Sequence, residues 1–239
     1  MEKQPHIQLD EQAAATKAVV VGDPARVDKF KPHLSGAQDL AYNREFKSIA
    51  GTYAGERILV LSCGVGAPSA GIAVEELYNI GVRKIIRVGS AGAMQSGIDL
   101  GELIIGIGAV RDDGLSKQYV DIAFPAVPSP ELLMAAKQLA PGAVYGVIRS
   151  HDGFYMDDNA ETEAYWSSKG VVGADMESGI LFTLGLLRGI ETLSILNNVV
   201  LYQEDLSDGV NALAHGDDKV AKGELASIEL ALNILSRVK

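Results

Sequence analysis

The sequence lacks several features that would direct the chain to particular compartments or partners. Cys63 is its only cysteine, so no disulfide can form within the chain and a reducing cytoplasm is expected. The longest apolar runs, such as residues 192–202, are too short to span a membrane and contain polar side chains. Residues 1–12 lack the apolar core of a signal peptide, which favours the same location. The net charge of −10 argues against nucleic acid or an anionic membrane as the main partner.

Signatures of several enzyme classes are missing as well. None of the histidines lies in an HExxH motif or in a Cys/His pair with zinc spacing, and there is no GxSxG elbow of an α/β-hydrolase. The loop SCGVGAPSAG (62–71) contains Gly64 and Gly66, but Ser69 occupies the third glycine position of a dinucleotide fingerprint. NAD binding is therefore not expected. Close approach of this backbone to a ligand or to a neighbouring subunit stays open.

The sequence does contain a regular alternation of β-branched runs and longer amphipathic stretches. Runs typical of strands cover residues 17–22, 56–64, 83–89, 102–110, 143–150 and 192–202. Stretches typical of helices cover residues 70–81, 129–140, 176–189 and 218–238. Because the first set is apolar on both faces, it predicts a largely parallel or mixed sheet with helices on both sides. Residues 1–239 fit one α/β domain of this kind, since no change in composition marks a linker.

Two local patterns refine this prediction. Residues 43–60 have the pattern of a hairpin that turns at Ala54 and Gly55. The last predicted helix is amphipathic, and Asp217 or Asp218 is suited to cap it. Its apolar side chains at helical spacing are Leu225, Ile228, Leu232 and Leu235.

A loop after the first predicted strand, VVVGDPARV (19–27), has the features of an anion site. Gly22 allows a sharp turn, Pro24 suits the first turn of a helix, and Arg26 extends from that helix start. Backbone N–H groups and a guanidinium there can hold an anion. A surface turn with a solvated arginine explains the same residues equally well.

A second cationic position, Arg87, lies inside the apolar run of IIRVGSAGAM (85–94). On a regular strand its side chain points away from Ile86 and Val88, and a charge in such a run needs a partner. One reading is a structural ion pair. The other, favoured by Ser90 at the carboxyl end of the strand, is a second anion clamp.

The stretch VGADMESG (172–179) places two carboxylates where an apolar run changes into a helical pattern. Asp175 and Glu177 flank Met176, and the residue types alone fit an acid/base pair, a sugar clamp, a metal site or a solvated helix start. Phe154 follows a predicted strand and either stacks on a flat ligand or belongs to the core.

Taken together, VVVGDPARV, NREF, IIRVGSAG and the carboxylate-Met-Glu helix start resemble, in order and spacing, the nucleoside phosphorylase family. This family includes the uridine phosphorylases and the hexameric bacterial purine nucleoside phosphorylases. The resemblance runs from PHI near the N-terminus to the final helix. It implies a three-layer α/β/α sandwich with a central mixed, partly barrel-like sheet. It also implies a homodimer as the minimum working unit and a homohexamer as the assembly.

The resemblance implies a phosphate site and no cofactor, because phosphate is a co-substrate. Gly22 and Arg26 correspond to the first phosphate contacts, and Arg87 and Ser90 to the second clamp. Arg44, in NREF, corresponds to an arginine that reaches into the neighbouring subunit's site. Arginines that neutralise and orient the phosphate dianion convert an encounter into a positioned reaction.

The ribose site is implied in the same way. His6, in PHI, corresponds to a histidine that the neighbouring subunit donates toward the ribose 5′-hydroxyl. Met176 and Glu177 correspond to residues that pack under the ribose and accept from its hydroxyls, with Ser90 nearby. Ionised Glu177 would stabilise the positive charge that develops on the sugar when the glycosidic bond breaks. Glu177, Arg87 and Arg26 are therefore the predicted catalytic residues.

The base-binding positions separate the two branches of the family. In the purine enzymes an aspartate after the late strand protonates the leaving base, and its place here falls at about Val199 and Val200. An apolar pair resembles the uridine branch. Asn198, one residue earlier, can donate a hydrogen bond if the register shifts. The acids of the next loop, which would replace the aspartate only after rearrangement, are Glu204, Asp205 and Asp208.

Other base contacts depart from the uridine branch. That branch usually reads uracil with a glutamine and an arginine, whose approximate places here hold Asp158 and Ala160. Phe154 corresponds to the aromatic that lies against the base. Asp175 stands where the family commonly has Glu, and it is assigned either to the base or hydroxyl edge or to a helix cap.

Some uridine phosphorylases hold potassium at the dimer interface, and the resemblance implies Glu45, Ser69 and the carbonyl of Val65 as its ligands here. The favoured function is a uridine-type ribonucleoside phosphorylase. The same reaction on purine nucleosides such as inosine is one alternative. A non-catalytic nucleoside- or phosphate-binding protein on the same fold is another.

Overall fold

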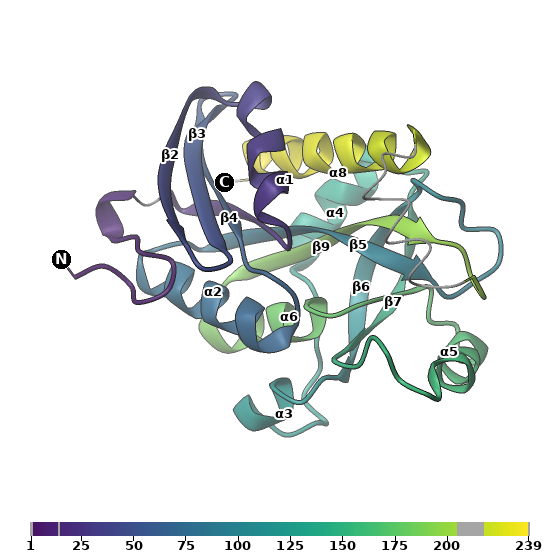
Figure 1. Ribbon diagram of the computed structural model, residues 1–239. Helices are drawn as coiled ribbons and strands as arrows, with labels where there is room; N and C mark the ends of the chain where they lie inside the picture. Colours follow the sequence, from purple (N-terminus) through teal and green to yellow (C-terminus); the bar gives the residue numbers. More distant parts are fainter. Residues whose placement is uncertain (1, 14, 205–217, 239) are drawn as a thin grey trace.

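One continuous β-sheet organises the computed structural model, which describes residues 2–13, 15–204 and 218–238 (Figure 1). Within these ranges nine strands follow the order β2-β3-β4-β1-β5-β8-β7-β6-β9. The strands are β1 (Lys17–Val21), β2 (Ser35–Asn43), β3 (Phe46–Tyr53), β4 (Glu56–Ser62), β5 (Lys84–Ala93), β6 (Leu103–Asp112), β7 (Val144–His151), β8 (Gly173–Asp175) and β9 (Glu191–Val200). The α-helices are α1 (Pro24–Lys29), α2 (Ala67–Asn79), α3 (Ser116–Tyr119), α4 (Pro130–Leu139), α5 (Asn159–Ser168), α6 (Ser178–Arg188) and α8 (Asp218–Arg237).

Part of this sheet closes on itself. The first half of β5 pairs with β1, as in Lys17 with Lys84, and its last residues pair with β8, as in Ala93 with Gly173. Along its length β5 also pairs with β9, so β5, β8, β7, β6 and β9 form a ring. Both parallel and antiparallel pairs occur in it. The predicted mixed, partly barrel-like sheet is therefore confirmed.

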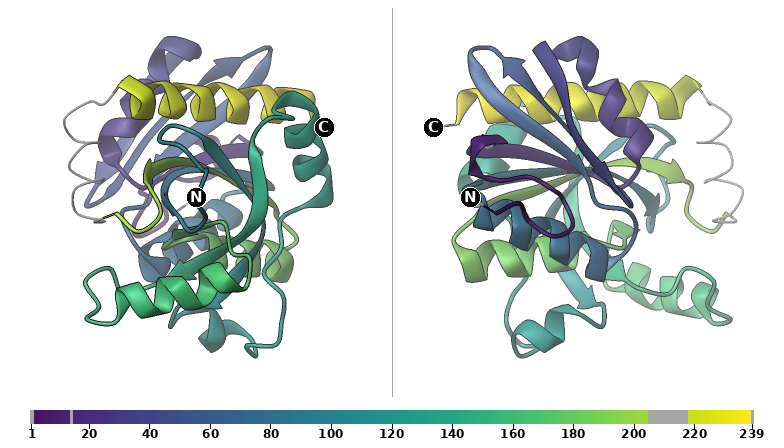
Figure 2. Two further views of the ribbon diagram at one scale, coloured as in Figure 1. Left: turned by 90° about the vertical axis from the view of Figure 1, so that its right-hand side faces the viewer. Right: turned by 60° about the vertical axis from the view of Figure 1, so that its left-hand side comes forward.

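Helices cover both faces of the sheet (Figure 2). In β1, Ala18 and Val20 pack toward α2 and α6, whereas Val19 and Val21 pack toward α1, α4 and α8. Every residue of β1 is buried, because each face of the strand meets a helical layer. This double cover explains the continuous apolar run in the sequence and confirms the three-layer α/β/α sandwich.

The predicted hairpin is formed by β3 and β4. Ala54 and Gly55 both have positive φ, 48° and 86°, which is the geometry of a tight two-residue turn. A second turn, at Arg44 and Glu45, joins β2 to β3 and was not predicted. The sequence did not reveal β2 because its side chains do not alternate regularly between buried and exposed. Its pairing with β3 is interrupted twice, which breaks the alternation.

The last predicted helix is confirmed as α8, and Ile228, Leu232 and Leu235 are buried as predicted, but the prediction for Leu225 is wrong. Leu225, expected in the core, is 45% exposed, whereas Glu224 is only 6% exposed. Asp218 begins the helix, and Asp217 lies outside the described residues. In the ranges that the structure describes, no helix is both long and apolar enough to cross a membrane.

Gly223 lets α8 lie directly on β9 and on the loop before β6. A Cβ at this position would lie 2.1 Å from Oδ1 of Asn197 and 2.3 Å from the carbonyl oxygen of Gly101. We expect Gly223→Ala to lower the free energy of unfolding by about 1–3 kcal/mol, measured by urea denaturation. Gly142→Ala, where a Cβ meets nothing within 4 Å, is the matched control. A Gly223→Ala protein as stable as the parent would contradict this close contact.

Candidate active site

Arg87 is buried in the first half of β5, level with Val20 near the carboxyl end of β1, on the face opposite Ile86 and Val88 as predicted. Its Nε donates to Oδ2 of Asp175 over 3.0 Å, and its Nη2 donates to Oε2 of Glu177. The guanidinium lies across Gly89, where a Cβ would come within 2.6 Å of Nη2. The glycine in this motif therefore makes room for the arginine.

The surroundings of Arg87 stabilise its protonated form. Burial disfavours the charged form, but Glu177 and Asp175 outweigh it, so the pKa of Arg87 lies above its ordinary value. Nη1 is buried and has no hydrogen-bond partner among the described residues. A buried donor without a partner is costly, so this atom is available to an anion that enters the site.

Glu177 connects the start of α6 to the loop before α2. Its Oε1 accepts from the backbone N–H of Gly66 over 2.6 Å. Gly66 has φ 94°, a conformation that favours glycine, and this residue is the N-cap of α2. Burial raises the pKa of Glu177 despite the opposing effect of Arg87. The loop at residues 62–71, which did not fit a dinucleotide fingerprint, thus brings its backbone into contact with Glu177, a predicted catalytic residue.

Asp175 caps α6 and anchors Arg87 at the same time. Its carboxylate accepts from the backbone N–H of Ser178 at 3.1 and 3.2 Å and from the Ser178 hydroxyl at 2.6 Å. Ser178 in turn lies 2.6 Å from the hydroxyl of Ser194 on β9. The N-cap residue of α6 is Glu177, whose side chain makes no capping bond, so Asp175 supplies this hydrogen bond from two residues earlier. A contact from Asp175 to a base stays a prediction. Met176, between the two carboxylates, is half-buried.

Arg26 is buried, which rules out the solvated surface turn. Its Nε donates to Oε1 of Glu224 over 2.6 Å, and its Nη2 donates to the hydroxyl of Ser90 over 3.2 Å. Asp23 caps the short helix α1 that carries it, accepting from the N–H of Ala25. Gly22 extends the pairing of β1 and β4 by accepting from Gly64 N–H. The two predicted clamps therefore meet around Gly89 and Ser90.

Glu224 is a site residue that the sequence reading missed. It binds Arg26 and also Lys29, whose Nζ lies 2.5 Å from Oε2. Burial acts to raise the pKa of Glu224, but Lys29 and Arg26 outweigh it and lower the pKa. The available signal was an acidic residue four positions after Val220 and four before Ile228, on the buried face of α8.

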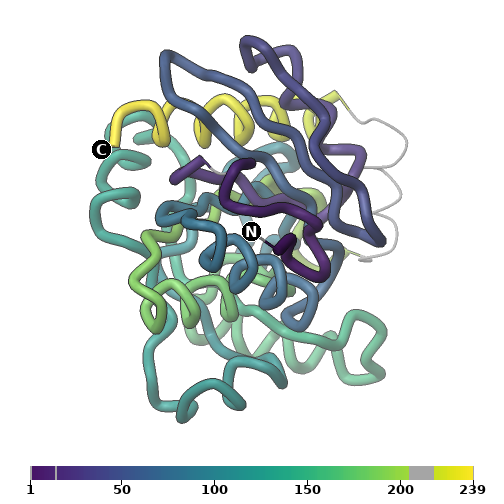
Figure 3. Tube along the Cα trace, turned by 90° about the vertical axis from the view of Figure 1, so that its left-hand side faces the viewer, coloured from purple at the N-terminus to yellow at the C-terminus, as the bar shows by residue number. Residues whose placement is uncertain are grey.

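His6 and Arg44 lie together at a separate place. The N-terminal segment runs beside α2 (Figure 3), where Nδ1 of His6 lies 2.6 Å from Oε1 of Glu76. The side-chain amide of Asn43 donates to the carbonyl of His6 over 2.8 Å, beside the turn that carries Arg44. Arg44 is exposed and has φ 54°. Within the described residues, no hydrogen bond joins either side chain to Arg26, Arg87 or Glu177.

Two of the three predicted potassium ligands are in contact. The Ser69 hydroxyl donates to Oε1 of Glu45 over 2.7 Å, and this hydrogen bond is the main cause of the lowered pKa of Glu45. Val65 is 73% exposed. Both side chains carry oxygen atoms of the kind that hard cations prefer, and the potassium site stays a prediction. No group of three or more His, Cys, Asp or Glu side chains suited to a metal occurs in the described part of the chain.

The predicted base residues are divided between two environments. Val199 and Val200 are buried and pack against Val220 of α8. The Asn198 amide donates to the carbonyls of Ile98 and Asp99 at 3.3 and 3.1 Å, so it holds the loop before β6. Their base contacts stay predictions. Asp205 and Asp208 lie outside the described residues.

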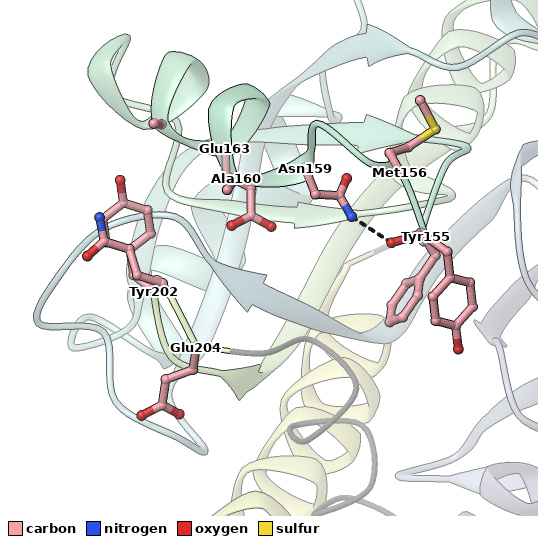
Figure 4. Close-up of a pocket in the computed structure, with 10 residues that line it drawn as sticks. Tyr155, Met156, Asn159, Ala160, Glu163, Tyr202 and Glu204 are labelled. Atoms are coloured by element: carbon pink, nitrogen blue, oxygen red, sulfur yellow. Dashed lines mark hydrogen bonds between the residues drawn. The ribbon is translucent and has the colours of Figure 1, made fainter.

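Phe154 instead lines a cavity of about 650 Å³ between α5 and the segment after β9 (Figure 4). Ala160 also lines it, and Asp158 is exposed at the start of α5. The remaining lining residues are Tyr155, Met156, Asn159, Glu163, Ala164, Tyr202, Gln203 and Glu204. Glu163 was not predicted as a site residue because α5 has no apolar periodicity to reveal it as a helix, and Tyr202, at the end of a predicted strand, was not singled out.

The geometry defines an α/β protein in which two buried arginines, Arg26 and Arg87, lie around Gly89 and Ser90 and are each paired with buried carboxylates. Residues 16–222 match the phosphorylase superfamily, and the chain belongs to that family. The resemblance drawn from four motifs is therefore confirmed.

Relatives in the family act on different bases. The structure superposes on the crystal structure of uridine phosphorylase from Vibrio fischeri ES114 with a TM-score of 0.93 and 45% identity, covering 100% of this chain and 99% of the other. The crystal structure of purine nucleoside phosphorylase from Toxoplasma gondii in complex with immucillin-H superposes with a TM-score of 0.86 and 31% identity. The match covers 99% of this chain and 98% of the other. Guanosine phosphorylase of Halorubrum lacusprofundi is 32% identical over 98% of this chain and 97% of its own.

Glu224→Gln tests whether Arg26 depends on its carboxylate partner for anion binding. The substitution keeps the shape of the side chain and removes the charge that fixes Nε of Arg26. We expect the Kd for inorganic phosphate, measured by titration calorimetry, to rise about 10-fold. Lys29→Gln is the control, because it removes the other, exposed partner of Glu224 and leaves Arg26 paired. Unchanged phosphate binding in Glu224→Gln would refute the dependence.

Proposed function

We propose that this nucleoside phosphorylase cleaves the N-glycosidic bond of ribonucleosides with inorganic phosphate and favours uridine-type substrates. The products are the free base and ribose 1-phosphate, which makes the protein a pentosyltransferase. The observation that carries the proposal is the pair of buried arginines, Arg26 and Arg87, around Ser90 and beside the buried Glu177. A cluster of this kind suits a reaction in which an anion attacks a sugar.

The arginines would bind and orient the phosphate. Arg26 reaches Ser90 with Nη2, and Arg87 has a buried Nη1 without a partner among the described residues. Both guanidinium groups are fixed through Nε by carboxylates from other elements, so little reorganisation is needed when phosphate binds. Holding the nucleophile in place replaces a bimolecular encounter with a positioned attack.

Glu177 would act on the ribose. Bond breakage leaves the sugar with oxocarbenium character, and a desolvated carboxylate stabilises that charge more strongly than water does. The Gly66 N–H and Arg87 hold Glu177 in place, while its position at the start of α6 leaves Met176 beside it. Phosphate then adds to the anomeric carbon as the base leaves with the bonding electron pair.

The preference for uridine is supported by the apolar pair Val199 and Val200 and by the 45% identity to a uridine phosphorylase. Purine nucleosides remain the alternative substrates, because the guanosine and purine enzymes are also relatives. A non-catalytic binding protein is disfavoured by the two buried arginines, Arg26 and Arg87, together with Glu177.

The proposed working unit is a homodimer, assembled into a homohexamer in the cytoplasm, with a role in nucleoside salvage. Arg44 is exposed on the β2–β3 turn, beside the His6 segment, and no hydrogen bond ties it to its own subunit's described phosphate residues. This placement fits a pair of side chains that serve a neighbouring site. Potassium bound near Glu45 and Ser69 is proposed as a structural element of the same region.

The activity is tested by phosphate-dependent release of free base from uridine, thymidine, inosine and adenosine. We expect turnover of uridine that requires phosphate. Turnover of inosine without uridine would overturn the preferred substrate. Absence of turnover for every nucleoside, with binding retained, would favour the non-catalytic alternative.

Arg44→Ala tests the shared site. We expect the KM for phosphate to rise at least about 10-fold with little change in thermal stability, since the side chain is exposed. Arg57→Ala, an exposed arginine on β4, is the control. Mixing Arg44→Ala subunits with weakly active Glu177→Gln subunits should raise activity at low phosphate above that of either variant alone, because a mixed dimer contains one complete site. The absence of such a rise would contradict donation between subunits.

The pH dependence should report Glu177. Burial raises the pKa of this carboxyl above its ordinary value of 4.5. As the pH falls through the raised pKa the carboxylate is protonated and loses the charge that stabilises the sugar. We therefore expect kcat/KM for the nucleoside, at saturating phosphate, to fall on the acid side at a pH above 4.5. The Glu177→Gln protein should be weakly active with no such acid limb. An unchanged acid limb in that variant would assign the titration to another group.

A further inference from the structure

The cavity beside Phe154 has the size and lining of a site for a flat heterocycle. Its volume of about 650 Å³ lies within the usual range for small-molecule sites. Phe154 supplies an aromatic face, and Tyr202, after β9, lies across the cavity from Tyr155 (Figure 4). The polar side chains that line it are Asn159 and Glu163 of α5, Gln203 and Glu204 after β9, and the phenols Tyr155 and Tyr202.

Strand pairing connects this cavity to the anion site. Ser150 near the end of β7 is paired with Asp175, and Phe154 follows four residues later. On the other rim, β9 runs beside β5, with Val200 opposite Gly92, and Tyr202 follows two residues later. Both rims therefore continue from strands that flank the Arg87 and Glu177 cluster. A nucleoside with its sugar at Glu177 would direct its base toward this space.

Glu163 is an unusual lining residue. It is half-buried, and its carboxylate has no hydrogen-bond or ion-pair partner in the part of the chain that the structure describes. Burial raises the pKa of Glu163, and Arg149 opposes this effect from a distance. Arg149 itself is paired with Asp112, its Nε lying 2.7 Å from Oδ2. An unpaired, partly desolvated carboxylate in a cavity is a typical binding group.

Asn159 lies one helical turn before Glu163, so the two side chains share a face of α5. The Asn159 amide nitrogen donates to the carbonyl oxygen of Phe154 over 2.7 Å, which fixes its orientation. Its second N–H remains as a donor. The cavity therefore offers an acceptor, the Glu163 carboxylate, and a nearby donor on the same helix.

We infer that Glu163 selects the base by accepting a hydrogen bond from a protonated ring nitrogen, with Asn159 donating to the adjacent carbonyl oxygen. This inference rests on the proposed function and names its substrate class. Uracil, hypoxanthine and guanine present a ring N–H next to a carbonyl. Cytosine and adenine instead present a ring nitrogen lone pair next to an amino group. An ionised Glu163 carboxylate repels the lone pair, and the Asn159 amide cannot donate to the amino group.

The test compares kcat/KM for uridine, inosine and guanosine with kcat/KM for cytidine and adenosine, at saturating phosphate. The wild type should favour the first group. Glu163→Gln should lower kcat/KM for the first group about 10- to 100-fold, change the second group little, and leave the KM for phosphate unchanged. Glu161→Gln is the matched control, because this exposed glutamate lies on the same helix outside the cavity.

The outcomes separate this inference from the function on which it rests. Equal rates for the two groups in the wild type, or equal losses for both groups in Glu163→Gln, would overturn the selective role of Glu163 and leave the phosphorylase intact. No phosphate-dependent turnover of any nucleoside would overturn the proposed function and this inference with it. A rise in the phosphate KM in Glu163→Gln would show that the variant disturbs the anion site, and would also overturn the assignment.

Discussion

The buried ion cluster of Arg87, Asp175 and Glu177 is the interaction on which the rest of the structure depends. It joins β5, β8 and the start of α6, and through Gly66 it reaches the loop before α2. Removing one partner would leave a charge unpaired in the interior, which costs about 3–5 kcal/mol. The closure of the barrel, the capping of α6 and the geometry of the site are therefore parts of a single electrostatic arrangement.

Much of the site was readable from the sequence because motifs at strand ends carry their own geometry. Arg87 inside an apolar strand required a buried partner, and Gly22, Pro24 and Arg26 marked a helix start beside it. The partners themselves were not readable. Glu224 lies 198 residues from Arg26 along the chain, and only the packing of α8 on the sheet brings the two together. Asp175 was identified as a carboxylate of interest, but its dual use as cap and anchor depends on the register of β8.

In the fold, too, some elements were predictable from the sequence and others were not. Strands covered on both faces have strong apolar runs. All six predicted strands are present, and their ends differ from the predicted ends by a few residues. The segments that were missed had no such signal, as β8 has three residues and α5 is mostly polar. In α8 the exposure of Leu225 and the burial of Glu224 were unpredictable, because hydrophobicity alone places the leucine inside. The acid is buried only because two cations meet it there.

Barrel closure has a consequence for association of the chain with itself. Because β9 returns to β5, the ring presents no open edge at that end, and among the described strands β2 is left as the border of the sheet. A border strand invites pairing with another chain. Here β2 is broken by two irregularities and bends at Gly36, so its N–H and C=O groups do not form a straight template. The sheet thus ends in a strand poorly suited to uncontrolled edge-to-edge aggregation.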